Sequence, residues 1–360
     1  MKNLSFLGLT STLAVVLTSG CGADHEREAS TETAVGSASS ALVTSTITYN
    51  GSDYGVDELA SCSTPRNIYL TEPNGAGPYP VFLYSGGSWE NYPDSPVAQA
   101  IVQYAAEQGF VAAFVDYRNN TIPRFCTDPQ GFWVPDNGWY KAQCAYSTFV
   151  NANSAIAKVC ARPKAGCSSH GIVTGGFSQG GYLAASARNF DTRVRGAWTM
   201  GIVDRTWDGV DQPCLDTAGG RVLSNNRLRV IRGVNDWTGF LLTTPAQKAQ
   251  FLNRTTGRSC SYTTDCFKGP NLSGWYLVPE SELNSTVNPA AHCFQANQPL
   301  GAGGNKVDCV DVGNPTPDPE GSTVDPVWER VPPASPTFPS GMYQSIQWLK
   351  NTVLPLGNQP

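Results

Sequence analysis

The sequence predicts an α/β protein with a mostly parallel central sheet and helices on both faces. Two observations lead to this prediction. Apolar segments bounded by Gly or Pro alternate with helical patterns along the chain, as in proteins built from strand–helix–strand units. Several of these segments, such as Tyr79–Tyr84 and Phe110–Val115, are apolar almost throughout, and this is typical of strands buried on both faces.

The same patterns locate the individual elements. We expect strands at residues 46–49, 67–71, 79–84, 110–115, 171–176, 195–200, 228–232 and 275–278. We expect helices at residues 95–109, 145–159, 180–189 and 341–353. The first helix has the clearest limits, since Asp94 or Ser95 can cap it, Pro96 suits its first turn and Gly109 ends it. The segments 203–227, 237–273 and 293–340 are predicted to be long connections.

Composition narrows the class of protein. The chain has 360 residues, of which 40% are hydrophobic, and this is enough apolar material for a real core. Its 24 Lys and Arg residues are scattered and the net charge is −5, so we expect no nucleic-acid partner. No internal repeat and no Pro/Ser-rich linker follow residue 44, which favours one domain at 45–360. We expect a monomer.

The N-terminus has the features of an export signal. A short basic start, Met1–Asn3, precedes the apolar segment Leu4–Leu17, which is too short to span a bilayer comfortably. Ser19, Gly20 and Cys21 then resemble a bacterial lipobox, which implies a signal peptide at 1–20 and a lipid on Cys21. The small, polar residues that follow make 21–44 a flexible tether. The predicted location is therefore a bacterial membrane, periplasmic or at the cell surface; the alternative is a secreted protein with a plain signal.

The cysteine count fits this location. Eleven cysteines are many for a reduced cytosolic chain, and a lipid on Cys21 leaves ten, enough for five disulfides. Proximity and subtraction suggest these pairs: Cys160–Cys167, Cys260–Cys266, Cys293–Cys309, Cys126–Cys144 and Cys62–Cys214. We expect no zinc site, because the chain has no C-x-x-C motif and only three His residues.

The motif Gly176–Gly180, G-F-S-Q-G, carries the main chemical signal. It fits G-x-S-x-G and lies between a predicted strand and a predicted helix, as this motif requires. Residues 45–355 therefore resemble the α/β-hydrolase superfamily, in its serine esterase and lipase part. The resemblance implies an α/β-hydrolase fold and makes Ser178 the nucleophile on a strained turn.

The base follows by elimination. Of the three His residues, His25 lies in the tether and His170 precedes the strand that ends at Ser178, so it belongs to the opposite edge of the sheet. His292 lies between the last predicted strand and the closing helix, where the resemblance places the catalytic His.

The acid is expected between the nucleophile and the base along the chain. Asp236 follows a predicted strand and a turn, and it resembles the family's acid-bearing loop. Three other acids remain as alternatives: Asp204, Asp208 and Asp265.

The oxyanion hole needs two backbone N–H donors. One is expected at Gln179, the residue after the nucleophile. The loop Ser85–Ser88 resembles the H-G-G-G loop of lipases and esterases, although Ser replaces its first and last residues, and it suggests Gly87 or Ser88 as the second donor. Asp116, Tyr117 and Arg118 also resemble the family and are interpreted as scaffold.

Together these residues predict an exported serine hydrolase that cleaves a small or polymeric carboxylic ester through an acyl-enzyme, with no cofactor and no metal. The alternatives are a peptidase, a thioesterase or a polyester depolymerase on the same fold, or a non-catalytic surface binding protein. Three tryptophans on predicted loops could line the substrate site or pack insertions: Trp89, Trp207 and Trp237.

Overall fold

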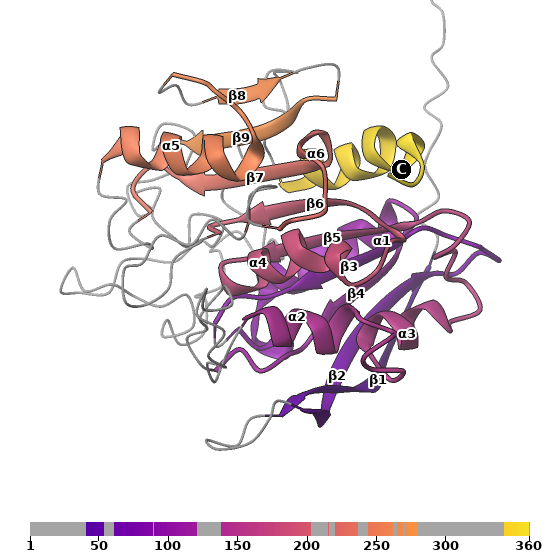
Figure 1. Cartoon of the computed structure of the whole chain (residues 1–360). Coiled ribbons are helices and arrows are strands. Elements are labelled where there is room, and N and C mark those ends of the chain that lie inside the picture. The colour runs from indigo at the N-terminus through magenta and orange to yellow at the C-terminus, as the bar shows by residue number, and fades with distance from the viewer. Residues whose placement is uncertain are drawn as a thin grey trace, which may run out of the picture. The chain divides into compact units, whose positions relative to one another are not determined.

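A sheet of nine strands organises the part of the chain that the computed structural model describes (Figure 1). The described residues are 41–53, 61–88, 90–120, 138–202, 215, 220–236, 244–261, 265–268, 271–279 and 342–359. Across the sheet the strand order is β1-β2-β4-β3-β5-β6-β7-β9-β8. The strands are β1 Leu42–Asp53, β2 Ser61–Pro73, β3 Val81–Ser85, β4 Val111–Val115, β5 Ile172–Phe177, β6 Val194–Met200, β7 Leu228–Gly233, β8 Asp265–Lys268 and β9 Ser273–Val278.

The central six strands, from β4 to β9 across the sheet, are parallel, whereas β1, β2 and β8 are antiparallel to their neighbours. Every residue of β3, β4, β5, β6 and β7 is buried. This explains the continuous apolar segments, because a strand covered on both faces has no solvent side to carry polar residues. The predicted fold class is therefore confirmed, and the carboxyl ends of the parallel strands meet at one edge.

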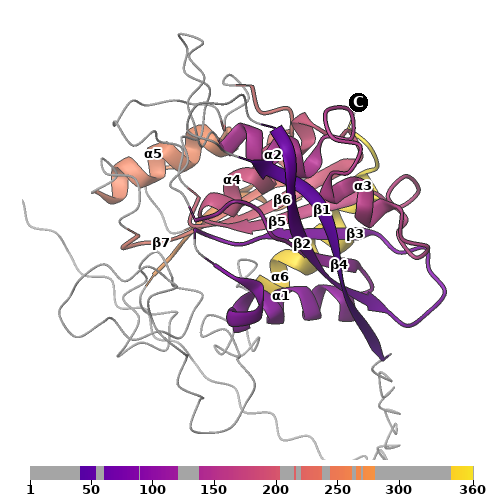
Figure 2. The ribbon, with the colours of Figure 1, turned by 90° about the horizontal axis from the view of Figure 1, so that it is seen from below.

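Helices cover both faces of this sheet (Figure 2). Their bounds are α1 Pro96–Glu107, α2 Gly138–Tyr146, α3 Ala155–Cys160, α4 Gln179–Ser186, α5 Pro245–Thr256 and α6 Met342–Trp348, with a π turn at Leu349–Val353. One apolar layer contains α1 and α6, through side chains such as Ile101 and Ile346. The other contains α2, α3, α4 and α5, through side chains such as Tyr146, Ile156 and Leu183. None of the helices in the described part is long and apolar enough to cross a membrane.

One predicted helix, at 145–159, was wrong in its limits. The chain instead forms α2, a polar turn and α3, because short polar side chains satisfy the backbone in between. Asn151 donates from its side chain to the backbone oxygens of Asn50 and Cys144, at 2.6 and 2.8 Å. Ser154 then caps α3 by accepting from the backbone N–H of Ala157.

The interval 237–273, predicted to be a connection, contains helix α5 and strand β8. Helix α5 begins with a complete capping box, in which Thr244 and Gln247 bond to each other's backbone N–H groups. It ends at Gly257, whose φ of 62° is left-handed. Strand β1 begins at Leu42, a little before the expected domain limit at residue 45.

Disulfides join the described elements at three places. Cys160–Cys167 and Cys260–Cys266 form as predicted. The predicted pairs Cys126–Cys144 and Cys62–Cys214 were wrong, because Cys62 bonds to Cys144. The reason is that β2 begins at Ser61, well before the predicted strand, so that Cys62 near its start lies beside Cys144 on α2. The predicted pair Cys293–Cys309 lies outside the described residues, as do Cys21, Cys126 and Cys214.

Removing the bond between β2 and α2 should be costly. The double substitution Cys62→Ser with Cys144→Ser is expected to lower the free energy of unfolding by about 4 kcal/mol, because the bond spans 82 residues of otherwise free chain. Urea unfolding of the variant and the wild type measures this loss.

The matched control is Cys160→Ser with Cys167→Ser. This bond spans 7 residues, so its removal should cost about 2 kcal/mol. A loss in the Cys62/Cys144 variant no larger than in this control would contradict the prediction.

Candidate active site

Ser178 lies on a sharp turn between strand β5 and helix α4. Its backbone has φ 51° and ψ −119°, a conformation that residues other than Gly rarely adopt. Two backbone hydrogen bonds hold it there: the Ser178 N–H donates to Met200 O at 2.8 Å, and the Ser178 carbonyl accepts from Gly181 N at 3.0 Å. Ser178 is half-buried between the fully buried Phe177 and Gln179. The strand–turn–helix context that the G-x-S-x-G motif requires is thus present.

The two glycines of the motif allow backbone segments to pass in direct contact. A Cβ on Gly176 would collide with the backbone of Gly180, and a Cβ on Gly180 would collide with the carbonyl oxygens of Ser85 and Gly86. A side chain at Gly176 would therefore force the strand away from the start of α4, and one at Gly180 would push the turn away from the loop after β3.

The loop Ser85–Ser88 lies directly beside Ser178. Strand β3 is hydrogen-bonded to β5, and Ser85 pairs with Gly176 at the carboxyl ends of the two strands. A Cβ built on Gly87 would be 3.4 Å from the Cβ of Ser178 and 2.7 Å from the ring of Phe177. The structure therefore brings together the nucleophile candidate and the loop that the sequence suggested as the second oxyanion donor.

Neighbouring side chains fix the backbone of this loop. The Tyr117 hydroxyl donates to Gly86 O at 2.7 Å, and Asn119 Nδ2 donates to Gly87 O at 3.0 Å. The Gly87 N–H itself donates to Glu90 Oε2 at 2.7 Å, while Ser95 Oγ donates to Glu90 Oε1 at 2.7 Å. Tyr117 thus acts as scaffold, as predicted, whereas no local pattern pointed to Glu90.

The carboxyl group of Glu90 is held against the loop by these two hydrogen bonds, in a residue that is partly buried. Burial raises the pKa of Glu90 above its ordinary value of 4.5, and the hydrogen bonds from Ser95 and Gly87 act in the opposite direction.

A second series of hydrogen bonds reaches the loop from helix α2. Lys141 is 1% exposed, and its Nζ donates to Gln179 Oε1 at 2.9 Å. Gln179 Nε2 in turn donates to Ser88 Oγ at 3.0 Å. Sequence reasoning missed Lys141, because nothing in its local pattern shows that a lysine is buried.

Asp236 lies at the same edge of the sheet as Ser178. It follows β7, and β6 separates β7 from β5. Its side chain is fully buried, and Oδ2 lies 3.3 Å from Nε of Arg232, which is also fully buried. Lys248 on α5 donates to Val234 O, and its pKa is lowered by burial and by Arg232, with Asp236 opposing the shift. The carboxylate therefore has two cationic side chains near it.

Several predicted residues lie outside the described part of the chain: His292, Asp204, Asp208, Trp89, Trp207 and Trp237. Asp265 is on the edge strand β8. His170 is exposed just before β5, at the opposite edge from Ser178, in agreement with the sequence interpretation. Within the described residues, no group of His, Cys, Asp and Glu could hold a metal ion.

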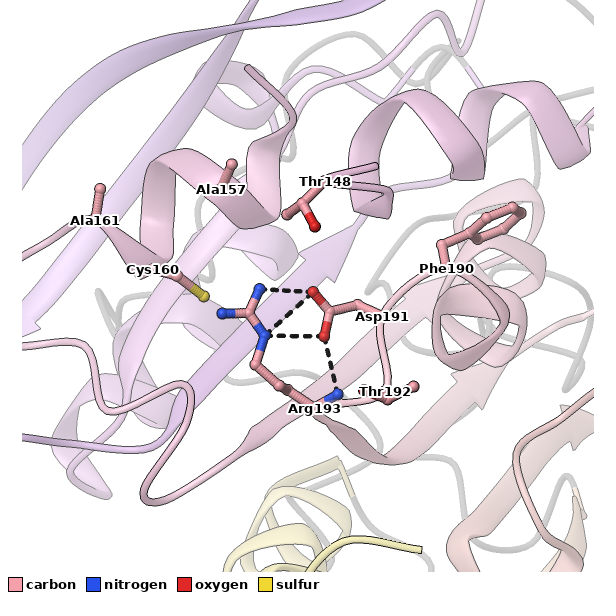
Figure 3. Close-up of a pocket in the computed structure, with 8 residues that line it drawn as sticks. All are labelled: Thr148, Ala157, Cys160, Ala161, Phe190, Asp191, Thr192 and Arg193. Carbon is pink, nitrogen blue, oxygen red and sulfur yellow. Dashed lines mark hydrogen bonds and ion pairs between the residues drawn. The ribbon is translucent and has the colours of Figure 1, made fainter. Parts of the chain in front are cut away.

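A pocket of about 590 Å³ lies elsewhere, at the amino end of β6. Figure 3 shows Arg193 facing both carboxylate oxygens of Asp191 in it. Nη2 of Arg193 lies 2.6 Å from Oδ2 of Asp191. Residues of α3 and Phe190 complete the lining. Because Asp191–Arg193 precede β6, this pocket is not at the edge that carries Ser178.

The strand order, the antiparallel β2 and the turn at Ser178 together define an α/β-hydrolase fold. The sequence matches no known protein-family profile and no curated protein.

Solved structures with a similar arrangement exist at low identity. One is a protein of unknown function from Agrobacterium tumefaciens, provisionally described as an α/β hydrolase, with 11% identity, a TM-score of 0.39, and coverage of 60% of this chain and 80% of that one. A second is a provisional dienelactone hydrolase from Klebsiella pneumoniae, with 11% identity, a TM-score of 0.41, and coverage of 60% and 81%. A third is the esterase Est22, with 14% identity, a TM-score of 0.33, and coverage of 54% and 65%.

The buried carboxyl of Glu90 predicts a pH-dependent contribution to stability. Because its pKa is raised, the folded protein binds a proton more readily than the unfolded chain at pH values just above 4.5. Its stabilising contribution is full below that value and is lost as the pH rises through the raised pKa. We therefore expect the free energy of unfolding of the wild type, relative to Glu90→Gln, to fall as the pH rises above the ordinary value of 4.5 and through the raised pKa.

Urea unfolding at several pH values measures this difference. Glu107→Gln is the control, since Glu107 is exposed at the end of α1 and should show no such trend. A difference between wild type and Glu90→Gln that stays constant across this interval would sink the prediction.

Proposed function

We propose that this chain is an exported serine hydrolase that cleaves carboxylic esters. The observation that carries the proposal is the strained backbone of Ser178 at the turn from β5 to α4, directly beside the loop Ser85–Ser88. Strain of this kind persists where the surroundings impose it, and such positions gather at active sites. A serine held at the carboxyl edge of a parallel sheet is placed for nucleophilic attack.

In the proposed reaction, Ser178 Oγ attacks the ester carbonyl carbon while His292 takes the hydroxyl proton. Asp236 orients His292 and stabilises its charged form. The tetrahedral intermediate expels the alcohol, which receives the proton from His292 and leaves an acyl-enzyme on Ser178. Water, deprotonated by His292, then attacks the acyl carbon, and the acid leaves as Ser178 regains its proton.

The proposed oxyanion hole combines the backbone N–H groups of Gln179 and Ser88. Gln179 is the first residue of α4, where an N–H group has no acceptor within the helix. Ser88 is preferred to Gly87 because the Gly87 N–H donates to Glu90. Each donor of this kind is typically worth about 3–4 kcal/mol in the transition state.

The preference for esters rests on the resemblance of G-F-S-Q-G-G to esterases and depolymerases. A panel of chromogenic esters of graded acyl length, peptide amides, thioesters and polyesters separates these substrate classes. Hydrolysis of peptides or thioesters with greater kcat/KM than esters would reverse the choice.

Labelling with a fluorophosphonate probe tests the nucleophile. The probe is expected to label the folded, oxidised wild type and to leave Ser178→Ala unlabelled, because phosphonylation requires the Ser178 oxygen. Ser186→Ala is the matched control: this buried serine of α4 donates to Tyr182 O and should leave labelling intact. No labelling of the wild type would refute the serine hydrolase, and labelling of Ser178→Ala would refute the choice of nucleophile.

The same labelling rate tests the other two members of the triad. We expect Asp236→Asn and His292→Ala to slow labelling about a thousandfold or more. Asp191→Asn provides the comparison, because it also removes a buried, ion-paired carboxylate but at the opposite end of the sheet. Equal rates in Asp236→Asn and Asp191→Asn would reassign the acid.

Export and lipid attachment at Cys21 form the second part of the proposal. The disulfides among the described residues support it, because such bonds persist in oxidising compartments.

Metabolic labelling with a palmitate analogue tests this anchor. The wild type, expressed with its own N-terminus in a bacterium, should carry the label and sediment with membranes, whereas Cys21→Ser should do neither. An unlabelled wild type released into the medium would favour the secreted alternative.

A further inference from the structure

Helix α2 contributes a buried lysine to the surroundings of Ser178. Lys141 lies on the face of α2 that packs against α4, and Figure 1 shows the two helices side by side. Burying a lysine amine is costly unless polar partners receive its hydrogens. Here the amide oxygen of Gln179, the residue after the proposed nucleophile, is such a partner.

The donor properties of lysine set the direction of the whole chain of hydrogen bonds. A lysine amine in its charged form only donates, so the atom of Gln179 that faces it must be the amide oxygen. The amide nitrogen then faces Ser88 Oγ, 3.0 Å away, and this oxygen acts as an acceptor. Removing the lysine would take away this constraint on the orientation of the amide, whose two ends have the same shape.

The hydrogen bonds from Lys141 through Gln179 to Ser88 connect the two segments that supply the proposed oxyanion donors. Gln179 begins α4, and Ser88 ends the loop after β3. Glu90 holds the other side of that loop through the Gly87 N–H. The donors must lie within about 2.7–3.1 Å of the developing oxyanion, so a small shift of Ser88 relative to Gln179 weakens both contacts.

Helix α2 itself is fixed at two further points. Cys144, three residues after Lys141, is bonded to Cys62 on β2. The hydroxyl of Tyr146 lies 2.9 Å from Ser85 Oγ, at the start of the same loop. The helix therefore provides a rigid base from which Lys141 reaches the turn at Ser178.

We propose that Lys141 is a positioning residue: through the amide of Gln179 it sets the separation of the Gln179 and Ser88 backbone donors. This inference rests on the proposed function, since it concerns stabilisation of the tetrahedral intermediate. It assigns to α2 a part in catalysis in addition to its place in the core.

Lys141→Met tests the proposal, because Met keeps the length of the side chain and removes its amine. With a p-nitrophenyl ester, kcat should fall about tenfold to a hundredfold, less than the loss of a whole oxyanion donor, while KM changes little. Affinity for an alkyl trifluoromethyl ketone, which forms an anionic adduct with the serine, should fall by a similar factor. Lys158→Met on α3 is the control and should leave all three quantities unchanged.

Ser88→Ala gives an independent reading if Lys141→Met does not fold. It keeps the backbone N–H and the Lys141–Gln179 contact but removes the far acceptor, so kcat should fall in the same direction. The fold-loss of kcat in the double variant should be smaller than the product of the two single losses, because both changes break the same series of hydrogen bonds.

The outcomes distinguish a failure of this inference from a failure of the proposed function. A wild type that fluorophosphonate does not label overturns both. A labelled wild type whose Lys141→Met variant, or Ser88→Ala where the former does not fold, keeps its kcat and ketone affinity overturns the role of Lys141 alone. A variant that changes only the melting temperature or only KM would also overturn the role of Lys141.

Discussion

The contact between backbone segments around Ser178 is the constraint on which the site depends. The turn after β5, the start of α4 and the loop after β3 approach so closely that Gly176 and Gly180 have no room for a Cβ. Parallel pairing of β3 with β5 makes this approach possible, since it brings Ser85 next to Gly176. The order of the strands in the sheet therefore determines which loop packs beside the strained serine.

Charged groups then hold what the sheet brings together. The carboxyl of Glu90 accepts from one side of the loop, and the amine of Lys141 acts on the other side through Gln179. Buried charges of this kind contribute little to stability by themselves, because desolvation offsets most of their attraction. Instead, they orient their hydrogen-bond partners: an amine that only donates and a carboxylate that accepts each fix the orientation of a neighbouring group. Asp236, beside Arg232, shows the same principle two strands away.

The sequence was sufficient for the features that depend on local pattern. Buried strands show as continuous apolar segments, and the turn at Ser178 shows as a glycine-flanked motif. Helix α5 escaped because most of its residues are polar, although its capping box was readable. The pairing of Cys62 with Cys144 depends on how far β2 extends. The role of Lys141 depends on its burial, and that of Glu90 on its hydrogen bond to Gly87; none of these is encoded in neighbouring residues.

The bond between Cys62 and Cys144 also orders events in time. In the exported chain proposed above, thiols stay reduced during synthesis and oxidise only after passage out of the cytoplasm. The helix that carries Lys141 gains its covalent attachment to β2 at that later stage. Under this proposal, assembly of the surroundings of Ser178 is completed only after export, and the newly made chain inside the cell lacks the covalent link between α2 and β2.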